Sequence, residues 1–154
     1  MSVQSETWYW EKTWSDFRRG SKRASLIWHG GEAVVDIYDE GAPRTFAAIQ
    51  AVLPLQIPVV HVAWSGDMVM STRSYDIGLN EQEHHVRLVR PGDLAFDPKF
   101  GEFTVTYGTA EARLPSGPNT LVVFGQIREG LDAFAAWGRA RRFEGVGTIE
   151  LRLN

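Results

Sequence analysis

The chain has 154 residues and a formal net charge of −3, with 44% hydrophobic and 23% charged residues. These proportions are those of an ordinary globular protein of one domain, long enough to bury a core without staples. The chain contains no cysteine, which excludes disulfides and thiolate catalysis and fits a reducing compartment. The acidic balance argues against nucleic acid as the main partner.

The ends and the apolar runs of the sequence bear on its location. The N-terminus has no basic segment followed by an apolar one, so the sequence predicts no signal peptide. No run of about 18 apolar residues occurs that could span a membrane. We therefore expect a cytoplasmic protein that has no membrane partner.

An aromatic-rich N-terminal extension, residues 1–22, precedes the predicted barrel domain, residues 23–154. Its rings have helical spacing in one part and strand-like alternation in another, so periodicity leaves its structure open. A cluster of this size is too apolar to leave in water. The rings therefore either pack on the chain's own barrel or form a homo-oligomer through Trp8, Trp10 and Trp14.

The first half of the barrel domain begins with a hairpin. Strands are predicted at Ala24–His29 and Glu32–Tyr38, and the Gly30-Gly31 pair between them tolerates the positive φ of a tight turn. Pro43 suits the first turn of a helix, and Pro54 ends that helix. Further strands are predicted at Ile57–Ala63, Asp67–Thr72, His85–Arg90, Leu94–Asp97 and Phe103–Tyr107.

The second half changes period twice. Leu121–Ile127 is short, β-branched and aromatic, which is typical of a buried strand. From Leu131 the apolar residues follow a helical stripe with arginines near its end, where they complement the helix dipole. The last strand alternates, with Ile149 and Leu151 facing inward. Two loops, Arg73–Gln82 and Leu114–Asn119, are candidate walls of a cleft.

Three segments of the chain resemble cyclophilins. Val122–Gly130, which reads V-V-F-G-Q-I-R-E-G, is similar to the late strand and turn of that family. Ala33–Phe46 resembles the early strand and helix start, and Pro91–Phe96 resembles the P-G-x-L-S-M segment. The resemblance implies a mainly β fold, a closed antiparallel barrel with two capping helices, in which the last strand pairs with the first.

The segment Val60–Asp67 is the strongest functional candidate. Strand alternation places Val60 and Val62 on one face and His61 on the other. If the valines fill the barrel, His61 faces outward, where the resemblance implies a peptide groove. The groove arginine of cyclophilins then falls on Val62, or on His61 after a slip of one residue. A histidine there is either structural or an acid/base group that titrates near neutral pH.

Other groove positions also differ from the cyclophilin pattern. The groove glutamine is replaced by Glu102, the second aromatic residue by Thr104 and the histidine by Leu121. The groups that bind and polarise the proline peptide in cyclophilins are therefore missing. The resemblance implies that prolyl isomerase activity is disfavoured, and this activity remains as an alternative.

The segments His61–Gly66, Pro91–Asp93 and Tyr107-Gly108 more specifically resemble small bacterial cyclophilin-like proteins of unassigned function. A related domain in cucumopine synthase condenses an amino acid with a 2-oxo acid. This resemblance implies a site for a small polar, carboxylate-bearing metabolite, which the protein binds or transforms. A non-catalytic binding or assembly module is the further alternative. The predicted site has catalytic His61 and Glu102, with substrate-binding Trp64, Tyr107 and Arg113.

Other chemistry-bearing patterns are weak. Glu81, Glu83, His84 and His85 are metal-ligand types, but adjacent histidines on a strand point to opposite faces. No phosphate-binding loop, dinucleotide fingerprint or nucleophile elbow occurs. We therefore expect no metal and no cofactor.

Overall fold

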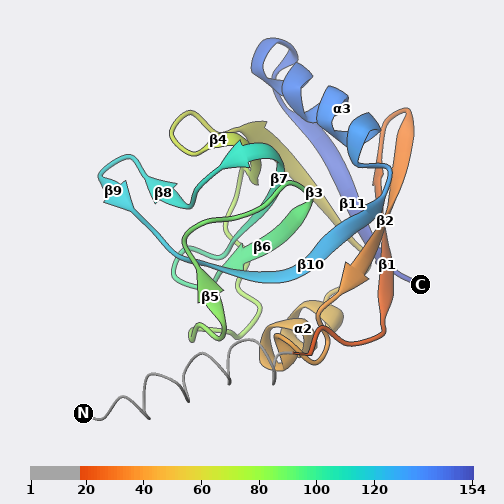
Figure 1. Ribbon diagram of the computed structural model, residues 1–154, viewed down its shortest axis with the longest axis vertical. Coiled ribbons are helices and arrows are strands. Elements are labelled where there is room, and N and C mark those ends of the chain that lie inside the picture. Colours follow the sequence, from red (N-terminus) through yellow and green to blue (C-terminus); the bar gives the residue numbers. More distant parts are fainter. Residues whose placement is uncertain (1–17) are drawn as a thin grey trace, which may run out of the picture.

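A computed structural model describes residues 18–154 and places a β-barrel between two helices (Figure 1). The helices are α2 (Pro43–Gln50) and α3 (Leu131–Glu144). The strands are β1 (Arg23–Trp28), β2 (Gly31–Ile37), β3 (Leu55–His61), β4 (Gly66–Ser71), β5 (His85–Val86), β6 (Asp93–Asp97), β7 (Glu102–Ala110), β8 (Arg113–Leu114), β9 (Gly117–Pro118), β10 (Leu121–Glu129) and β11 (Gly147–Leu153).

The aromatic N-terminal extension falls largely outside this description. Trp8, Trp10 and Trp14 precede residue 18, so the interface assigned to them stays a prediction. Within the described residues, none of the helices has the length and apolar character needed to cross a membrane.

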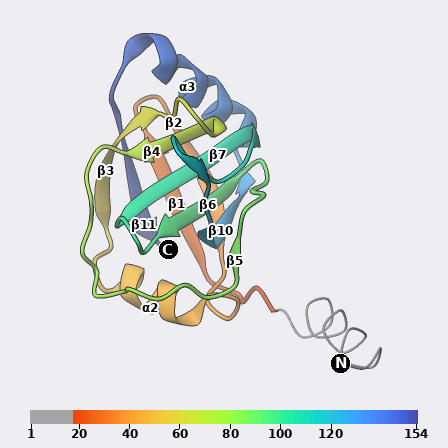
Figure 2. The same cartoon turned by 90° about the vertical axis from the view of Figure 1, so that its left-hand side faces the viewer.

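Eight antiparallel strands form a closed barrel. The order is β2-β1-β11-β3-β4-β7-β6-β10, and β10 pairs with β2 to complete the ring. Seen from two directions, α3 covers one end of the barrel and α2 lies at the other (Figures 1 and 2). The mainly β barrel with two capping helices, predicted from the sequence, is confirmed.

The first and last strands meet as expected. β11 pairs with β1 along its length, with Leu151 opposite Leu26 and Ile149 opposite Trp28. Ile149 and Leu151 are buried. Because successive side chains of a strand alternate between faces, these two residues enter the core, while Arg152 lies on the other face and stays exposed.

Aromatic rings fill the middle of the barrel. The ring of Phe103 meets Phe96 at 4.9 Å and Phe124 at 6.1 Å between centroids, both edge to face. Such pairs contribute about 0.5–1.5 kcal/mol beyond the area they bury. The three strands that supply them, β6, β7 and β10, also carry the groove described below, so this packing fixes the groove's wall.

Helix α3 is held against the barrel by one aromatic anchor and one glycine. Phe134 is fully buried and packs edge-on against Trp28, with centroids 5.2 Å apart. At Gly138 a Cβ atom would lie 2.9 Å from the ring of Tyr107. Glycine therefore allows the helix to sit directly on that tyrosine, and the last turn of α3 reaches the end of β3.

Helix α2 begins at Pro43, as predicted, and a distant carboxylate completes its first turn. The backbone N–H of Thr45 donates to Glu83 Oε1 at 2.6 Å. Arg44 forms ion pairs with Glu83 and Glu81. Glu81 and Glu83 are of residue types that can bind a metal, but here they bind Arg44 and the backbone at the start of α2. No group of three metal-ligating side chains is found within residues 18–154.

The strands after residue 80 depart most from the sequence prediction. β5 ends at Val86 instead of Arg90, because the backbone that follows turns away: the Arg87 carbonyl accepts from the Ala112 N–H, and the Arg90 N–H donates to the Asp93 side chain. The predicted loop 114–119 carries a small hairpin, β8–β9. That hairpin stands over the outer face of the barrel (Figure 1).

Candidate functional site

The outer face of the barrel carries a groove between the β3–β4 connection and the β8–β9 hairpin. It encloses about 40 Å³, enough for roughly two or three water molecules. Its apolar floor consists of Val62, Met68, Met70, Ala112 and Leu121. A ligand could therefore insert only a small group here, and the rest of it would lie along the open part of the groove.

This outer face is apolar because the loops cover it. Val62, Met68, Ala95, Ala112 and Leu121 belong to a second hydrophobic cluster, separate from the barrel core. A strand that packs on both faces has apolar residues at odd and even positions alike. The second cluster gives the groove a rigid floor.

All four positions where the sequence departs from the cyclophilin groove line this pocket: Val62, Glu102, Thr104 and Leu121. Of the two positions considered for the groove arginine, Val62 lines this pocket and His61 does not. Val62 and Leu121 have no polar group, Thr104 has a neutral hydroxyl, and Glu102 is an acid, so none of the four replacements carries a positive charge.

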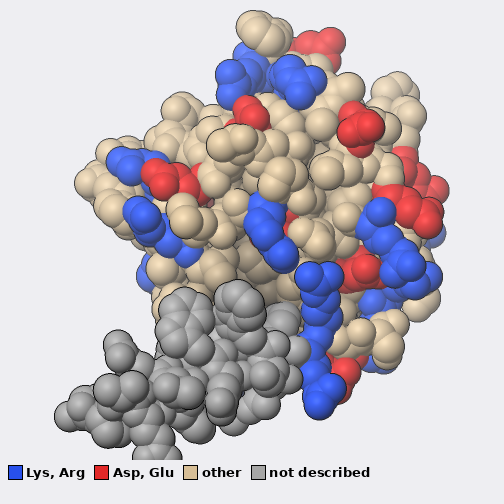
Figure 3. Space-filling model, viewed as in Figure 1, with Lys and Arg blue, Asp and Glu red and all other residues tan. Residues whose placement is uncertain are grey.

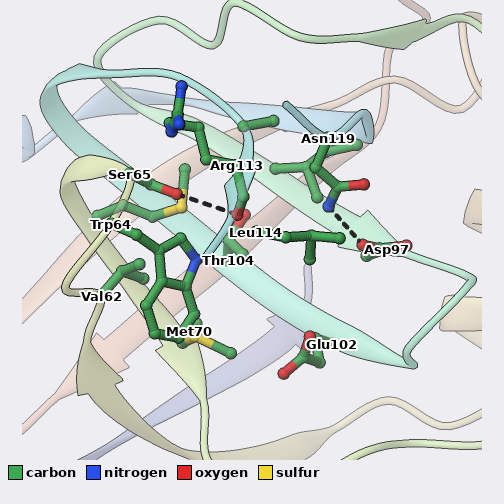
Figure 4. Close-up of a pocket in the computed structure, with 13 residues that line it drawn as sticks. Val62, Trp64, Ser65, Met70, Asp97, Glu102, Thr104, Arg113, Leu114 and Asn119 are labelled. Carbon is green, nitrogen blue, oxygen red and sulfur yellow. Dashed lines mark hydrogen bonds between the residues drawn. The ribbon is translucent and has the colours of Figure 1, made fainter. Parts of the chain in front are cut away.

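Trp64, Glu102 and Arg113 lie around the same pocket (Figure 4). The indole ring of Trp64 lies beside Val62 and Met70, and Glu102 and Arg113 occupy opposite ends. Trp64 is 38% exposed, so part of its side chain is available to a ligand.

The cation at the rim is weakly engaged. Arg113 Nη1 pairs with Glu111 Oε1 at 3.2 Å, and the Arg113 side chain keeps 38% of its surface exposed. An exposed pair of this kind contributes only about 0–1 kcal/mol. A carboxylate entering the groove can thus share or replace Glu111.

The acidic end holds two carboxyl groups on paired strands. Asp97 of β6 lies opposite Glu102 of β7 in the register. Asp97 is buried and bound by Lys99 Nζ at 3.1 Å and by Asn119 Nδ2 at 2.9 Å. Burial raises the pKa of Glu102, and the nearby Asp97 charge raises it further. Glu102 is therefore the groove's candidate for proton transfer.

One buried hydroxyl in the groove lacks a partner. Thr104 lines the pocket and is 8% exposed, and its Oγ1 atom has no hydrogen-bond partner among the described residues. A buried polar atom left unpaired costs about 1–3 kcal/mol. Thr104 could recover this cost by bonding a ligand or a water molecule.

His61 and Tyr107 lie elsewhere. The core residues Ile57 and Val59 face the interior, and His61 shares their parity, whereas Val62 faces the groove. The sequence prediction that His61 points outward and Val62 inward is therefore reversed. Both faces of the strand are apolar, so alternation alone could not set the parity. The five predicted site residues divide into two groups.

The second group lies at a recess beneath the end of α3, which His61 lines and which Tyr107 adjoins through its contact with His61. His61 Nε2 lies 2.7 Å from the Tyr107 hydroxyl, and its Nδ1 lies 2.8 Å from the Val62 carbonyl oxygen. Because a carbonyl only accepts, Nδ1 carries the proton and Nε2 accepts from tyrosine. Desolvation lowers the pKa of His61, and the positive charge of Arg142 lowers it further. The hydrogen bond to the Val62 carbonyl raises this pKa, but the net shift is downward.

Sequence reasoning missed two members of this group. Arg142 Nε lies 3.2 Å from His61 Nε2, and Arg142 Nη2 lies 3.5 Å from Asp67 Oδ1. The sequence pattern connects Arg142 only with the helix dipole, and it is 81 residues from His61. No local spacing could have indicated this contact, which depends on where α3 docks.

The closed eight-stranded barrel with a helix at each end is the cyclophilin-like fold. The chain belongs to the family described as "Protein of unknown function (DUF3830)", which matches it over residues 25–153. A comparison with curated proteins finds no match.

Two solved structures share the fold. McbB, solved in complex with tryptophan, superposes with a TM-score of 0.69 at 18% identity, over 84% of this chain and 44% of McbB. The hypothetical protein AF2241 from Archaeoglobus fulgidus gives a TM-score of 0.60 at 18% identity, over 89% and 98%. At these identities the likeness establishes the fold alone, and the chain spans less than half of McbB.

Proposed function

We propose that the protein binds a small, carboxylate-bearing metabolite in the outer groove and exchanges a proton with it through Glu102. The observation that carries this proposal is the presence of Trp64, Glu102 and Arg113 around one apolar pocket. An apolar wall with a few polar groups is the usual composition of small-molecule sites.

Each of the three residues has a distinct part. Arg113 binds the ligand's carboxylate, since a guanidinium group can donate two parallel hydrogen bonds to it. Trp64 covers the apolar part of the ligand. Glu102, at the far end, faces a hydrogen-bond donor such as an amine. Its raised pKa brings proton exchange closer to neutral pH, where general acid/base catalysis is most effective.

The unpaired hydroxyl of Thr104 and the likeness to McbB support this assignment. Thr104 Oγ1 offers a buried hydrogen bond within the groove. McbB, a protein with a barrel of this fold, was solved with tryptophan, which is itself a carboxylate-bearing amine. Amino acids are thus the first ligand class to test, with 2-oxo acids as the class that lacks the amine.

Prolyl isomerisation is not favoured by any observation in the groove. Val62 and Leu121 offer neither a donor to the twisting amide nor a charge, and Thr104 replaces an aromatic floor. A proline-peptide assay should therefore show no rate above background. Activity comparable to that of a cyclophilin would contradict the small-molecule proposal.

A thermal-shift screen of amino acids, 2-oxo acids and cyclic amides tests the proposal. A ligand at about 100 times its dissociation constant stabilises the folded state by about 2.7 kcal/mol, a melting shift of roughly 5–10 °C. Arg113→Gln should remove the shift for carboxylates. Arg128→Gln, a half-exposed arginine on β10 paired with Asp36 at 3.5 Å, is the matched control. A screen without any hit, or hits unaffected by Arg113→Gln, would overturn the proposal.

A further inference from the structure

We propose that the recess beneath the end of α3 is a second binding site, separate from the groove, that takes a small oxyanion on Arg142. The anion is a carboxylate or a phosphate group, which share the oxygen geometry that a guanidinium group recognises. The recess is lined by residues of β3, of the β3–β4 connection, of the start of β4 and of the last turn of α3, among them His61, Gly66, Arg141 and Arg142.

The recess has the size of a ligand site. Its volume is about 400 Å³, ten times that of the groove and within the range of small-molecule pockets, about 300–1,000 Å³. Small residues keep it open: Ala63 and Gly66 form part of its wall. Gly66 has a φ of 108°, and a Cβ atom there would lie 2.5 Å from the Thr109 carbonyl oxygen. This turn therefore favours glycine, which adds no side chain to the recess.

Two hydrogen-bond donors share one acceptor atom at the edge of this recess. The Tyr107 hydroxyl and Arg142 Nε both point at His61 Nε2, at 2.7 and 3.2 Å. That nitrogen has a single lone pair in the plane of its ring, and Nδ1 is committed to the Val62 carbonyl. Tyr107 makes the shorter of the two contacts, so Arg142 shares this lone pair only weakly and also bonds the Tyr107 hydroxyl.

The guanidinium group of Arg142 is loosely held. Its ion pair with Asp67 is 3.5 Å long, and 45% of its side chain is exposed. Arg141, in contrast, is committed to Glu144 at 2.8 Å and to the ring of Trp137, where its Cζ lies 4.5 Å from the centroid. Arg142 is thus the cation of this turn that is available to a ligand.

The surrounding charges favour an anion. Arg139, Arg141 and Arg142 all belong to the end of α3, and blue side chains gather there at the top of the molecule (Figure 3). The guanidinium of Arg139 lies over the ring of Tyr107 at 5.6 Å. Among the described residues, Asp67 and Glu144 are the carboxylates that pair with these arginines. Three cations against two carboxylates leave the site positive.

An incoming oxyanion would take the fork of Arg142 in place of its long contacts to His61 and Asp67. Tyr107 would keep its hydrogen bond to His61, so the ring would retain a donor when Arg142 turns to the ligand. Val62 separates the two sites, because it lines both the groove and the recess. The recess therefore has its own cation, Arg142, as the groove has Arg113.

Titration of the whole chain with inorganic phosphate and with sodium acetate, at ionic strength held constant with sodium chloride, tests the proposal. The readouts are the imidazole NMR signals of His61 and the melting temperature. We expect a saturable change in one or both titrations, and the tighter anion distinguishes a phosphate site from a carboxylate site. Arg142→Gln should weaken binding by about tenfold or more, because the bidentate bonds are lost.

Control variants separate anion binding at Arg142 from anion binding at the protein's other arginines. Arg128→Gln should leave anion binding unchanged. Arg113→Gln should leave the response of the His61 NMR signals to both anions unchanged, although it removes carboxylate binding in the groove, so that failure here is distinct from failure of the proposed function. Arg142→Lys, which keeps the charge and loses the fork, should bind with intermediate strength. Equal binding in Arg142→Gln, or no saturable response to either anion, would overturn the proposal. So would a melting temperature lowered by Arg142→Gln with no change in anion affinity, because it would make Arg142 structural.

Discussion

The groove and the recess lie on two sides of one short segment and differ in character. The groove has an apolar floor, a buried Asp97 and a Glu102 whose pKa is raised by burial. The recess is polar and basic, with His61 kept neutral beside Arg142. The groove is small and covered by a hairpin, whereas the recess is ten times larger and open to solvent.

The difference shows how a barrel strand can serve two sites. Successive residues point to opposite faces, so His61 and Val62 belong to different surroundings although they are adjacent. Helix α3 places Arg142 beside His61, whereas β7 and β10 supply residues that line the groove together with Val62. Changes to α3 should therefore alter the recess and spare the groove, which the following variants examine in order of decreasing effect.

Removing the anchor of α3 should have the largest effect. Phe134→Ala deletes a fully buried ring that packs against Trp28 and should lower the free energy of unfolding by about 3–5 kcal/mol. Urea unfolding followed by tryptophan fluorescence measures this loss. Phe143→Ala, in the same helix but 87% exposed, is the matched control and should change stability by no more than about 0.5 kcal/mol. Equal effects of the two variants would contradict the anchoring role.

A methyl group at Gly138 should have a smaller effect, directed at the recess. In Gly138→Ala the new Cβ would lie 2.9 Å from the Tyr107 ring. We expect a net loss of about 0–2 kcal/mol, because overpacking costs about 1–3 kcal/mol while alanine returns about 1 kcal/mol of helix propensity. The His61 imidazole signals should shift as Tyr107 moves.

Ala136→Gly, at an exposed position of the same helix, controls for propensity. It should cost about 1 kcal/mol and leave the His61 signals in place. A Gly138→Ala variant more stable than the parent protein would show that the helix and Tyr107 separate without strain.

Much of the fold could be predicted because its boundaries are local. The helix start at Pro43 and the alternation of Ile149 and Leu151 each depend on a few adjacent residues. The first hairpin was predicted with its turn at Gly30-Gly31, but the turn lies one residue earlier, at His29-Gly30, and Gly31 pairs with Trp28 in the sheet. The β5 strand was predicted too long because residues after Val86 bond to the Ala112 and Asp93 segments instead of a neighbouring strand. Such competition between distant segments has no local sequence pattern.

The candidate site was also predictable only where the evidence for it lies in the local sequence. Glu102, Trp64 and Arg113 were found through residue type and resemblance, and the structure brings them around one groove. His61 was placed on the wrong face because its strand is apolar on both sides. Without alternating polar residues, the sequence does not show which face of the strand points into the barrel. Arg142 could not be found, because its contact arises from the docking of α3 on Tyr107 through Gly138.

Removing the indole ring of the groove should affect ligand affinity and little else. Trp64→Ala should weaken binding of any ligand found in the screen by roughly tenfold, about 1.4 kcal/mol, because it removes an apolar wall. Trp64 is 38% exposed, so the free energy of unfolding should change little. Phe100→Ala, an aromatic residue 44% exposed and outside the groove lining, is the control. Binding titrations by calorimetry would show whether only the groove variant loses affinity; phosphate binding in the recess should persist in both.

The response to acid should be the smallest effect, and its sign should differ between the two regions. The pKa of His61 is lowered from its ordinary value of 6.5, chiefly by burial. As pH falls below 6.5 the unfolded chain takes up this proton first, so His61 makes the folded state less stable in acid. The pKa of Glu102 is raised above 4.5, also chiefly by burial. Between that raised pKa and 4.5 the folded chain takes up the proton first, so Glu102 makes it more stable as pH falls.

Single variants should separate these opposing slopes. His61→Gln should remove the loss of stability below pH 6.5, while Glu102→Gln should remove the gain at lower pH and raise stability at pH 7, where the parent carboxylate is ionised and partly desolvated. Both effects are small because both side chains are partly exposed. Urea midpoints between pH 4.5 and 8, compared with the parent protein at matched ionic strength, measure them. If both variants changed the slope in the same direction, the two groups would share one electrostatic environment, and the division into an apolar acidic groove and a basic recess would be wrong.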